Sequence, residues 1–123
     1  MPLTNRETAR LERRLIATLI DACETAKTEI PGFDWLTHTV DYTTFPQSLR
    51  VIWVFDSRAS KEHALSTGAD QRMRELTAAA LHDADVHGAS MERCVHFDSE
   101  EECRLRHDGD WRLRLAKVHT TKV

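Results

Sequence analysis

Four cysteine and histidine residues in the last third of the chain have a spacing that suits metal binding. They are Cys94, His96, Cys103 and His107. Residues two apart share one face of a strand, and residues four apart share one face of a helix, so each pair can present two ligands together. Structural zinc sites use four such sulfur and nitrogen ligands. The pattern therefore suggests a zinc site; the alternative is two partly buried cysteines and two surface histidines.

Three aspartates stand where strands of a sheet are expected to begin or end. Asp56 and Asp98 each follow a phenylalanine and precede a serine, and Asp34 lies where the first strand is entered. If the strands before Asp56 and Asp98 are parallel neighbours, the three carboxylates meet at one edge of the sheet. There they could hold Mg²⁺ for the hydrolysis of a phosphate ester. The alternative is that each Asp-Ser pair only caps the helix that follows it.

Basic residues surround a tryptophan near the carboxyl end. Trp111 is followed by Arg112 and Arg114, with apolar residues between the arginines. A tryptophan in this setting can stack on a nucleic-acid base while the arginines pair with phosphates. The same alternation is typical of a half-buried strand whose arginines lie in water. The candidate nucleic-acid-binding residues are Arg104, Arg106, Trp111, Arg112, Arg114 and Lys117.

Charge is distributed unevenly along the chain. The 123 residues have a net charge of −3, but residues 104–123 carry six Arg or Lys against two Asp. Residues 1–14 carry four Arg against two Glu, so the region between the two ends is strongly acidic. Basic ends on an acidic body could reach a polyanion, although the whole chain is not a basic DNA-coating protein.

Composition is that of an ordinary folded domain, with 30% charged residues. No apolar run approaches the roughly 20 residues of a membrane span, so no membrane partner is expected. Arginines and glutamates interrupt the amino end, which argues against a signal peptide. Three cysteines at irregular spacing argue against a disulfide framework and predict a reducing, cytoplasmic location. No P-loop, Gly-x-Ser-x-Gly or dinucleotide motif indicates a small-molecule substrate.

Local signals predict the elements that position these residues. Thr4 and Glu7 form a capping box before apolar residues at helical spacing, which predicts a long helix from about Asn5 to Pro31-Gly32. Strands are predicted over residues 35–42 and 49–55, and the second is apolar on both faces, as a central strand is. A short helix after Ser57 and a longer one over residues 69–85 precede a third strand over residues 92–97.

The carboxyl-terminal part allows two interpretations. Ser99 and Glu102 form a capping box that predicts a short helix over residues 100–107, followed by an edge strand or a flexible tail over residues 110–123. Alternatively, residues 103–107 pair with residues 111–115 as a hairpin across Asp108-Gly109, which would gather the arginines on one face.

Together these elements predict a single α+β domain over residues 1–123. A long amino-terminal helix is followed by the order β-β-α-α-β. Strand two lies in the centre, antiparallel to strand one and parallel to strand three, because a helical crossover joins the last two. Helices on one side of the sheet leave Ile52 and Val54 without cover, so either the carboxyl-terminal segment or a second subunit of a homodimer should provide it.

The central block resembles a family of small bacterial proteins of unknown role, often labelled Fis-family transcriptional regulators. The residues that carry the resemblance are GFDWLTHTVDY, FPQSL and VFDS, followed by HFDSEEEC. The similarity covers most of residues 10–111. The label of this family implies a DNA-binding regulator.

The order of elements is similar to that of ribosome-binding factor A and of type II KH domains. Pro46-Gln47-Ser48-Leu49-Arg50 enters strand two much as a Ser-Pro-Asp-Leu-Arg element does in that factor. Ser66-Thr67-Gly68 falls where that family bends its helix pair at an Ala-x-Gly. Gly68 is followed by Ala69 and Asp70, so the chain lacks the Gly-x-x-Gly clamp of KH domains. The resemblance implies structured RNA or the ribosome as a partner.

These patterns favour a small non-enzymatic binding or regulatory protein whose partner is structured RNA, the ribosome or DNA. One alternative is a divalent-metal-dependent phosphoesterase that uses Asp56 and Asp98. A second alternative is a protein-binding adaptor or a homodimer.

Overall fold

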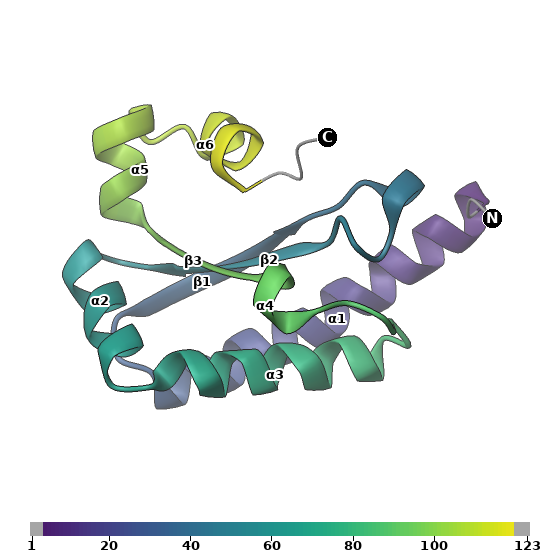
Figure 1. The fold of residues 1–123 in the computed structure, drawn as a ribbon, viewed down its shortest axis with the longest axis horizontal. Coiled ribbons are helices and arrows are strands. Elements are labelled where there is room, and N and C mark those ends of the chain that lie inside the picture. Colours follow the sequence, from purple (N-terminus) through teal and green to yellow (C-terminus); the bar gives the residue numbers. More distant parts are fainter. Residues whose placement is uncertain (1–3, 120–123) are drawn as a thin grey trace.

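A three-stranded sheet separates the helices of the chain into two groups (Figure 1). The structure, a computed structural model, describes residues 4–119. The predicted α+β class and the β-β-α-α-β order behind a long amino-terminal helix are confirmed. The elements are α1 (Asn5–Glu29), β1 (Phe33–Thr39), the 3₁₀ turn η1 (Tyr42–Thr44), β2 (Arg50–Phe55), α2 (Arg58–Ser66), α3 (Ala69–Asp83), α4 (Met91–Cys94), β3 (Val95–Ser99), α5 (Glu100–His107) and α6 (Trp111–Val118).

The capping box predicted at the start of α1 is present. The Glu7 N–H donates to Thr4 Oγ1 at 3.1 Å, and the Thr4 N–H donates to Glu7 Oε1 at 3.1 Å. One side of the helix is buried along its length, through Leu11, Leu15, Leu19, Ala22 and Ala26. At the other end Gly32 has a φ of +81°, and a Cβ there would lie 2.5 Å from Ser60 Cβ, so only glycine fits the turn into β1.

β2 is the central strand, as its apolar sequence predicts. It pairs antiparallel with β1 and parallel with β3, and its residues from Val51 to Phe55 are all buried. The crossover between β2 and β3 is formed by α2 and α3, which is the connection that parallel neighbours require. The predicted strand order and directions are therefore confirmed.

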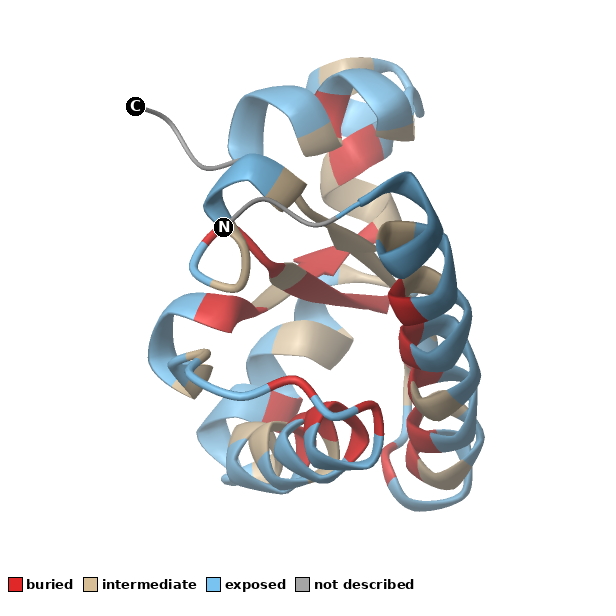
Figure 2. Ribbon diagram, turned by 90° about the vertical axis from the view of Figure 1, so that its right-hand side faces the viewer, coloured by how far each residue is buried: buried red, intermediate tan, exposed pale blue. Residues whose placement is uncertain are grey.

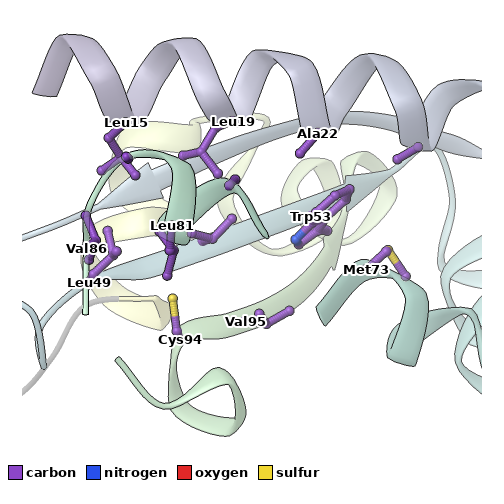
Figure 3. Packing of buried hydrophobic residues seen from close by; sticks show 14 of the residues in the cluster. Leu15, Leu19, Ala22, Leu49, Trp53, Met73, Leu81, Val86, Cys94 and Val95 are labelled. Atoms are coloured by element: carbon purple, nitrogen blue, oxygen red, sulfur yellow. The ribbon is translucent and has the colours of Figure 1, made fainter. Parts of the chain in front are cut away.

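One face of the sheet carries the main apolar core. Trp53 is fully buried there, and its indole N–H donates to Thr77 Oγ1 of α3 at 3.1 Å. Figure 3 shows Leu15 and Leu19 of α1 and Leu81 of α3 packed around the strands. Helices α1 and α3 together cover this face (Figure 1).

The opposite face of the sheet is covered by α5 and α6 (Figure 1). Ile52 and Val54 project to this side, because side chains alternate along a strand, and both are fully buried within one chain. The sequence leaves open whether the carboxyl-terminal segment or a second subunit covers Ile52 and Val54. In the structure the carboxyl-terminal segment covers both.

The strand boundaries differ from the prediction by up to three residues, most at the end of β1 and at the start of β3. β1 ends at Thr39 rather than at residue 42, because the Asp41 carboxylate accepts the Thr43 N–H at 3.0 Å and starts the turn η1. β3 begins at Val95 rather than at residue 92. The preceding residues form the helical turn α4, in which the Cys94 N–H donates to the Ser90 carbonyl at 2.8 Å.

The predicted strand or flexible tail after residue 110 is wrong for residues 111–118, which form α6. The hairpin interpretation is wrong as well. Asp108 and Gly109 have φ values of 56° and 79° and reverse the chain, and the Asp110 carboxylate then caps α6 by accepting the Leu113 N–H at 3.1 Å. The rest of the predicted tail, residues 120–123, lies outside the described residues.

The outward side of α1 is exposed along most of its length (Figure 2). This helix is the longest in the structure, at 25 residues, but charged residues recur on its exposed side. Within residues 4–119 no helix is both long enough and apolar enough to cross a bilayer.

Candidate functional site

Asp98 is the centre of a buried polar cluster between the sheet and the carboxyl-terminal helices. It stands opposite Val54 in the β2–β3 register, on the face that α5 and α6 cover, and is only 1% exposed. Arg114 of α6 binds it with both arms: Nε donates to Oδ2 at 2.7 Å and Nη2 to Oδ1 at 2.8 Å. His119 Nε2 approaches Oδ2 at 2.5 Å, and the Ser99 N–H donates to Oδ1 at 2.8 Å. Both carboxylate oxygens are thus fully used.

Two further N–H groups of Arg114 are also engaged. Nη2 lies 3.4 Å from Glu102 Oε2, and Nη1 lies 3.1 Å from His107 Nδ1. Because a guanidinium can only donate, His107 accepts through Nδ1. Arg114 is 5% exposed, so this bidentate ion pair is closed to solvent.

Three hydrogen bonds run in series from Asp98 to the backbone of Arg93. His119 Nε2 contacts Asp98, His119 Nδ1 lies 3.1 Å from His96 Nδ1, and His96 Nε2 lies 3.0 Å from the Arg93 carbonyl oxygen. An ionised carboxylate and a carbonyl can only accept, so each Nε2 atom is the donor in its bond.

Ion pairs set the two carboxylates of the cluster, Asp98 and Glu102, against the Arg114 guanidinium. Burial by itself would raise the pKa of Asp98, but hydrogen bonds from His119 and Arg114 outweigh burial and hold the pKa well below its ordinary value. Burial lowers the pKa of His96, and the neighbouring His119 lowers it further. The cluster is thus built for an ionised Asp98.

A second contact fixes α6 against β1. The indole N–H groups of Trp35 and Trp111 both donate to Glu100, at 2.5 Å and 3.0 Å. The two rings meet edge to face with centroids 5.0 Å apart. Further along, the Thr39 hydroxyl donates to the His119 carbonyl at 3.0 Å. The carboxyl-terminal helices are therefore held to the sheet at several points.

The four predicted zinc ligands do not come together. Cys94 belongs to the apolar core with α1 and α3, whereas Cys103 is buried under α5 outside that core. His96 bonds to His119, and His107 bonds to Arg114. The prediction fails because Cys94 lies in a helical turn before β3 rather than on the strand face of His96. Among residues 4–119 no three or more His, Cys, Asp or Glu side chains are placed to hold a metal ion.

The three predicted magnesium ligands are divided between solvent and interior. The strand ends meet at one edge of the sheet as expected, and Asp34 and Asp56 are exposed there. Asp98 instead turns into the buried cluster, where Arg114 and His119 occupy its oxygens. The serines do act as caps: Ser57 Oγ accepts the Ser60 N–H and Ser99 Oγ accepts the Glu102 N–H, both at 3.1 Å.

The cysteines should differ sharply in reactivity. Cys94 and Cys103 are buried, and burial raises the pKa of the Cys94 thiol to about 11 and also raises that of Cys103. Cys23 is partly exposed on α1. An alkylating reagent at neutral pH should therefore modify Cys23 alone in the native protein, as mass spectrometry of proteolytic peptides would show. Modification of Cys94 or Cys103 at the rate of Cys23 would contradict the described packing.

The predicted nucleic-acid-binding residues fall into two groups. Arg114 is buried in its ion pair, and Trp111 is half-buried with its N–H bonded to Glu100, so neither is free to meet a base or a phosphate. This corrects the predicted role of both residues. The other four side chains are exposed, and none has an ion-pair partner within the described residues: Arg104, Arg106, Arg112 and Lys117.

No local sequence pattern marks His119 of the buried cluster or Glu100 of the tryptophan contact, because both bond to residues far away in the chain. A signal for α6 did exist, because Asp108-Gly109-Asp110 combines a helix-ending glycine with a helix-capping aspartate. A helix that starts at this signal can bring Arg114 next to Asp98.

Comparison of the chain with protein-family models, with curated proteins and with solved structures finds no match. The two resemblances noted in the sequence therefore remain predictions, and the function has to be argued from the geometry.

Proposed function

We propose that the chain is a small non-enzymatic binding protein that docks on the phosphate backbone of a structured nucleic acid through α5 and α6. The observation that carries the proposal is the set of four exposed basic side chains on these helices without ion-pair partners among residues 4–119. Unpaired arginines and lysines are the groups that neutralise phosphates.

The mounting of the two helices supports this role. The Asp98–Arg114 ion pair and the Glu100 contact with Trp35 and Trp111 fix α5 and α6 to the sheet. Basic groups carried on fixed helices lose less freedom on binding than those of a flexible tail. The middle of the chain is acidic, so a polyanion is repelled there.

The inward position of Trp111 favours a folded or double-stranded partner over a single strand. Single strands are bound largely by stacking of bases on exposed aromatic rings. Trp111 packs against Trp35 instead, which leaves phosphate contacts as the available interaction. Structured RNA, including ribosomal RNA, and duplex DNA both present such phosphates.

Reversal of two charges on this surface should abolish the binding. Arg104 and Arg112 are a suitable pair to change, because one lies on α5 and the other on α6. With about four phosphate contacts, binding of a labelled RNA or DNA duplex should weaken roughly a hundredfold between 50 and 200 mM salt. The variant Arg104→Glu/Arg112→Glu should bind at least tenfold more weakly. The slope of its log binding constant against log salt concentration should be shallower by about two, because two phosphate contacts are lost. Fluorescence anisotropy measures both quantities.

A matched control places the same change of charge elsewhere. Arg6 and Arg14 are exposed on α1, on the other side of the sheet. The variant Arg6→Glu/Arg14→Glu should bind with an affinity within about threefold of the unchanged protein. Equal losses in both variants would mean that only net charge matters and would contradict a site on α5 and α6. The absence of salt-dependent binding by the unchanged protein would exclude the function.

A further inference from the structure

An apolar stripe runs along the outward side of α1 next to β1. Ile16 and Ile20 are 42% and 52% exposed, and Cys23 continues the stripe one turn further. Together with Leu36 of β1 they line an open hollow of about 320 Å³. Exposed isoleucines on consecutive turns of one helix form a patch of the kind that marks an interaction surface.

Within residues 4–119 the edge of β1 next to this stripe has no strand partner. β1 is an outer strand of the sheet, and between Trp35 and Thr39 it contains neither proline nor lysine. The only irregularity lies at its start, between Phe33 and Trp35. Natural edge strands usually contain a proline or a lysine, or are covered by another segment, because an open edge can pair with a further strand.

The charges beside the stripe are mostly basic at its amino-terminal end and mostly acidic at its carboxyl-terminal end. Arg10 and Arg13 lie on the amino-terminal side of Ile16. Asp21 and Glu24 lie on the carboxyl-terminal side of Ile20, and Lys27 lies beyond them. All five charged side chains are exposed, and none has an ion-pair partner in the described part of the chain. Positions 9, 13, 16, 20, 23 and 27 follow the alternating four-and-three spacing of a helix that packs along another helix. A second α1 that runs in the opposite direction is complementary to this arrangement.

We propose that two copies of the chain associate about a two-fold axis, through antiparallel α1 helices and adjoining β1 edges. Ile16 of one copy then lies against Ile20 of the other, and Arg10 lies beside Glu24 of the other. Because the hollow places Ile16 and Ile20 next to Leu36, the same axis brings the two β1 edges together and extends the sheet across both copies. The interface leaves α5 and α6 on the other side of the sheet free, so it does not depend on the proposed function.

The mass in solution tests the association. Sedimentation equilibrium under reducing conditions should give twice the chain mass of 14.1 kDa at high concentration, with dissociation on dilution. The variant Ile16→Asp/Ile20→Asp should stay monomeric at every concentration. Leu105→Asp is the control, since Leu105 is 74% exposed on α5, and it should associate as the unchanged protein does. Far-UV circular dichroism checks that each variant keeps its helices.

A charge exchange tests the antiparallel arrangement. Arg10→Glu should weaken association tenfold or more, because it places two carboxylates together, and the variant Arg10→Glu/Glu24→Arg should restore it. A monomer at all concentrations, or a dimer unaffected by the isoleucine changes and the charge exchange, would overturn the proposal.

Discussion

Replacement of Arg114 by methionine should lower the free energy of unfolding by about 3–5 kcal/mol. Methionine retains much of the length of the side chain but leaves Asp98 as a buried carboxylate without its bidentate partner. Glu102 and His107 lose a partner at the same time. Equilibrium unfolding in urea, followed by tryptophan fluorescence, measures the loss.

The same substitution two residues earlier in the helix serves as a control. Arg112 belongs to α6 as well but is exposed, so Arg112→Met should change stability by less than about 0.5 kcal/mol. The double variant Asp98→Leu/Arg114→Met removes both charges and should recover most of the loss, because apolar side chains can replace a buried ion pair. A loss in Arg114→Met no larger than that in Arg112→Met would show that the ion pair is not formed.

Acidification should remove stability that Asp98 supplies at neutral pH. The pKa of Asp98 is held well below its ordinary value in the folded chain, whereas in the unfolded chain it is about 3.9. Between these two values the unfolded state binds more protons, so stability falls as the pH falls. The contribution is complete above about pH 5 and is lost progressively below it. A salt-bridged aspartate of this kind supplies on the order of 2–3 kcal/mol.

Urea unfolding at a series of pH values measures this dependence. Asp98→Leu/Arg114→Met should lose less stability below about pH 5 than the unchanged protein, because only the other carboxylates with lowered pKa values, Glu7, Glu29, Asp41 and Asp85, still contribute. The pKa of His96 is lowered by burial, so acidification through its ordinary value of about 6.5 also costs stability, and that loss should persist in the double variant. Parallel pH profiles for the two proteins below about pH 5 would contradict the placement of Asp98.

The amino-terminal part of the fold follows from local signals. Thr4 and Glu7 cap α1, and Gly32 and Pro31 end it, by contacts within a few residues of one another. The apolar run of β2 requires cover on both faces whatever the surroundings are, so its central position could be predicted. Such features depend on neighbouring residues, and a sequence discloses them directly.

The candidate site could not be predicted in the same way. Asp98 binds partners 16 and 21 residues further along the chain, and Trp35 binds Glu100 across 65 residues. The alternation of Trp111, Arg112 and Arg114 was interpreted with the period of a strand, although Asp110 marks the start of a helix. A strand over these residues predicts that Arg114 points into solvent, whereas the helix directs its side chain towards Asp98.

The central claim, that the chain docks on nucleic acid through α5 and α6, is tested most directly in a lysate of the cells that make it. The tagged protein would be sedimented through a sucrose gradient at low and at raised salt, beside the variant Arg104→Glu/Arg112→Glu. We expect the unchanged protein to migrate with ribosomal subunits or other nuclease-sensitive material, to be released by salt or nuclease, and the variant to stay at the top. If the unchanged protein also stays at the top at low salt, or migrates with material that nuclease and salt leave intact, the claim is contradicted.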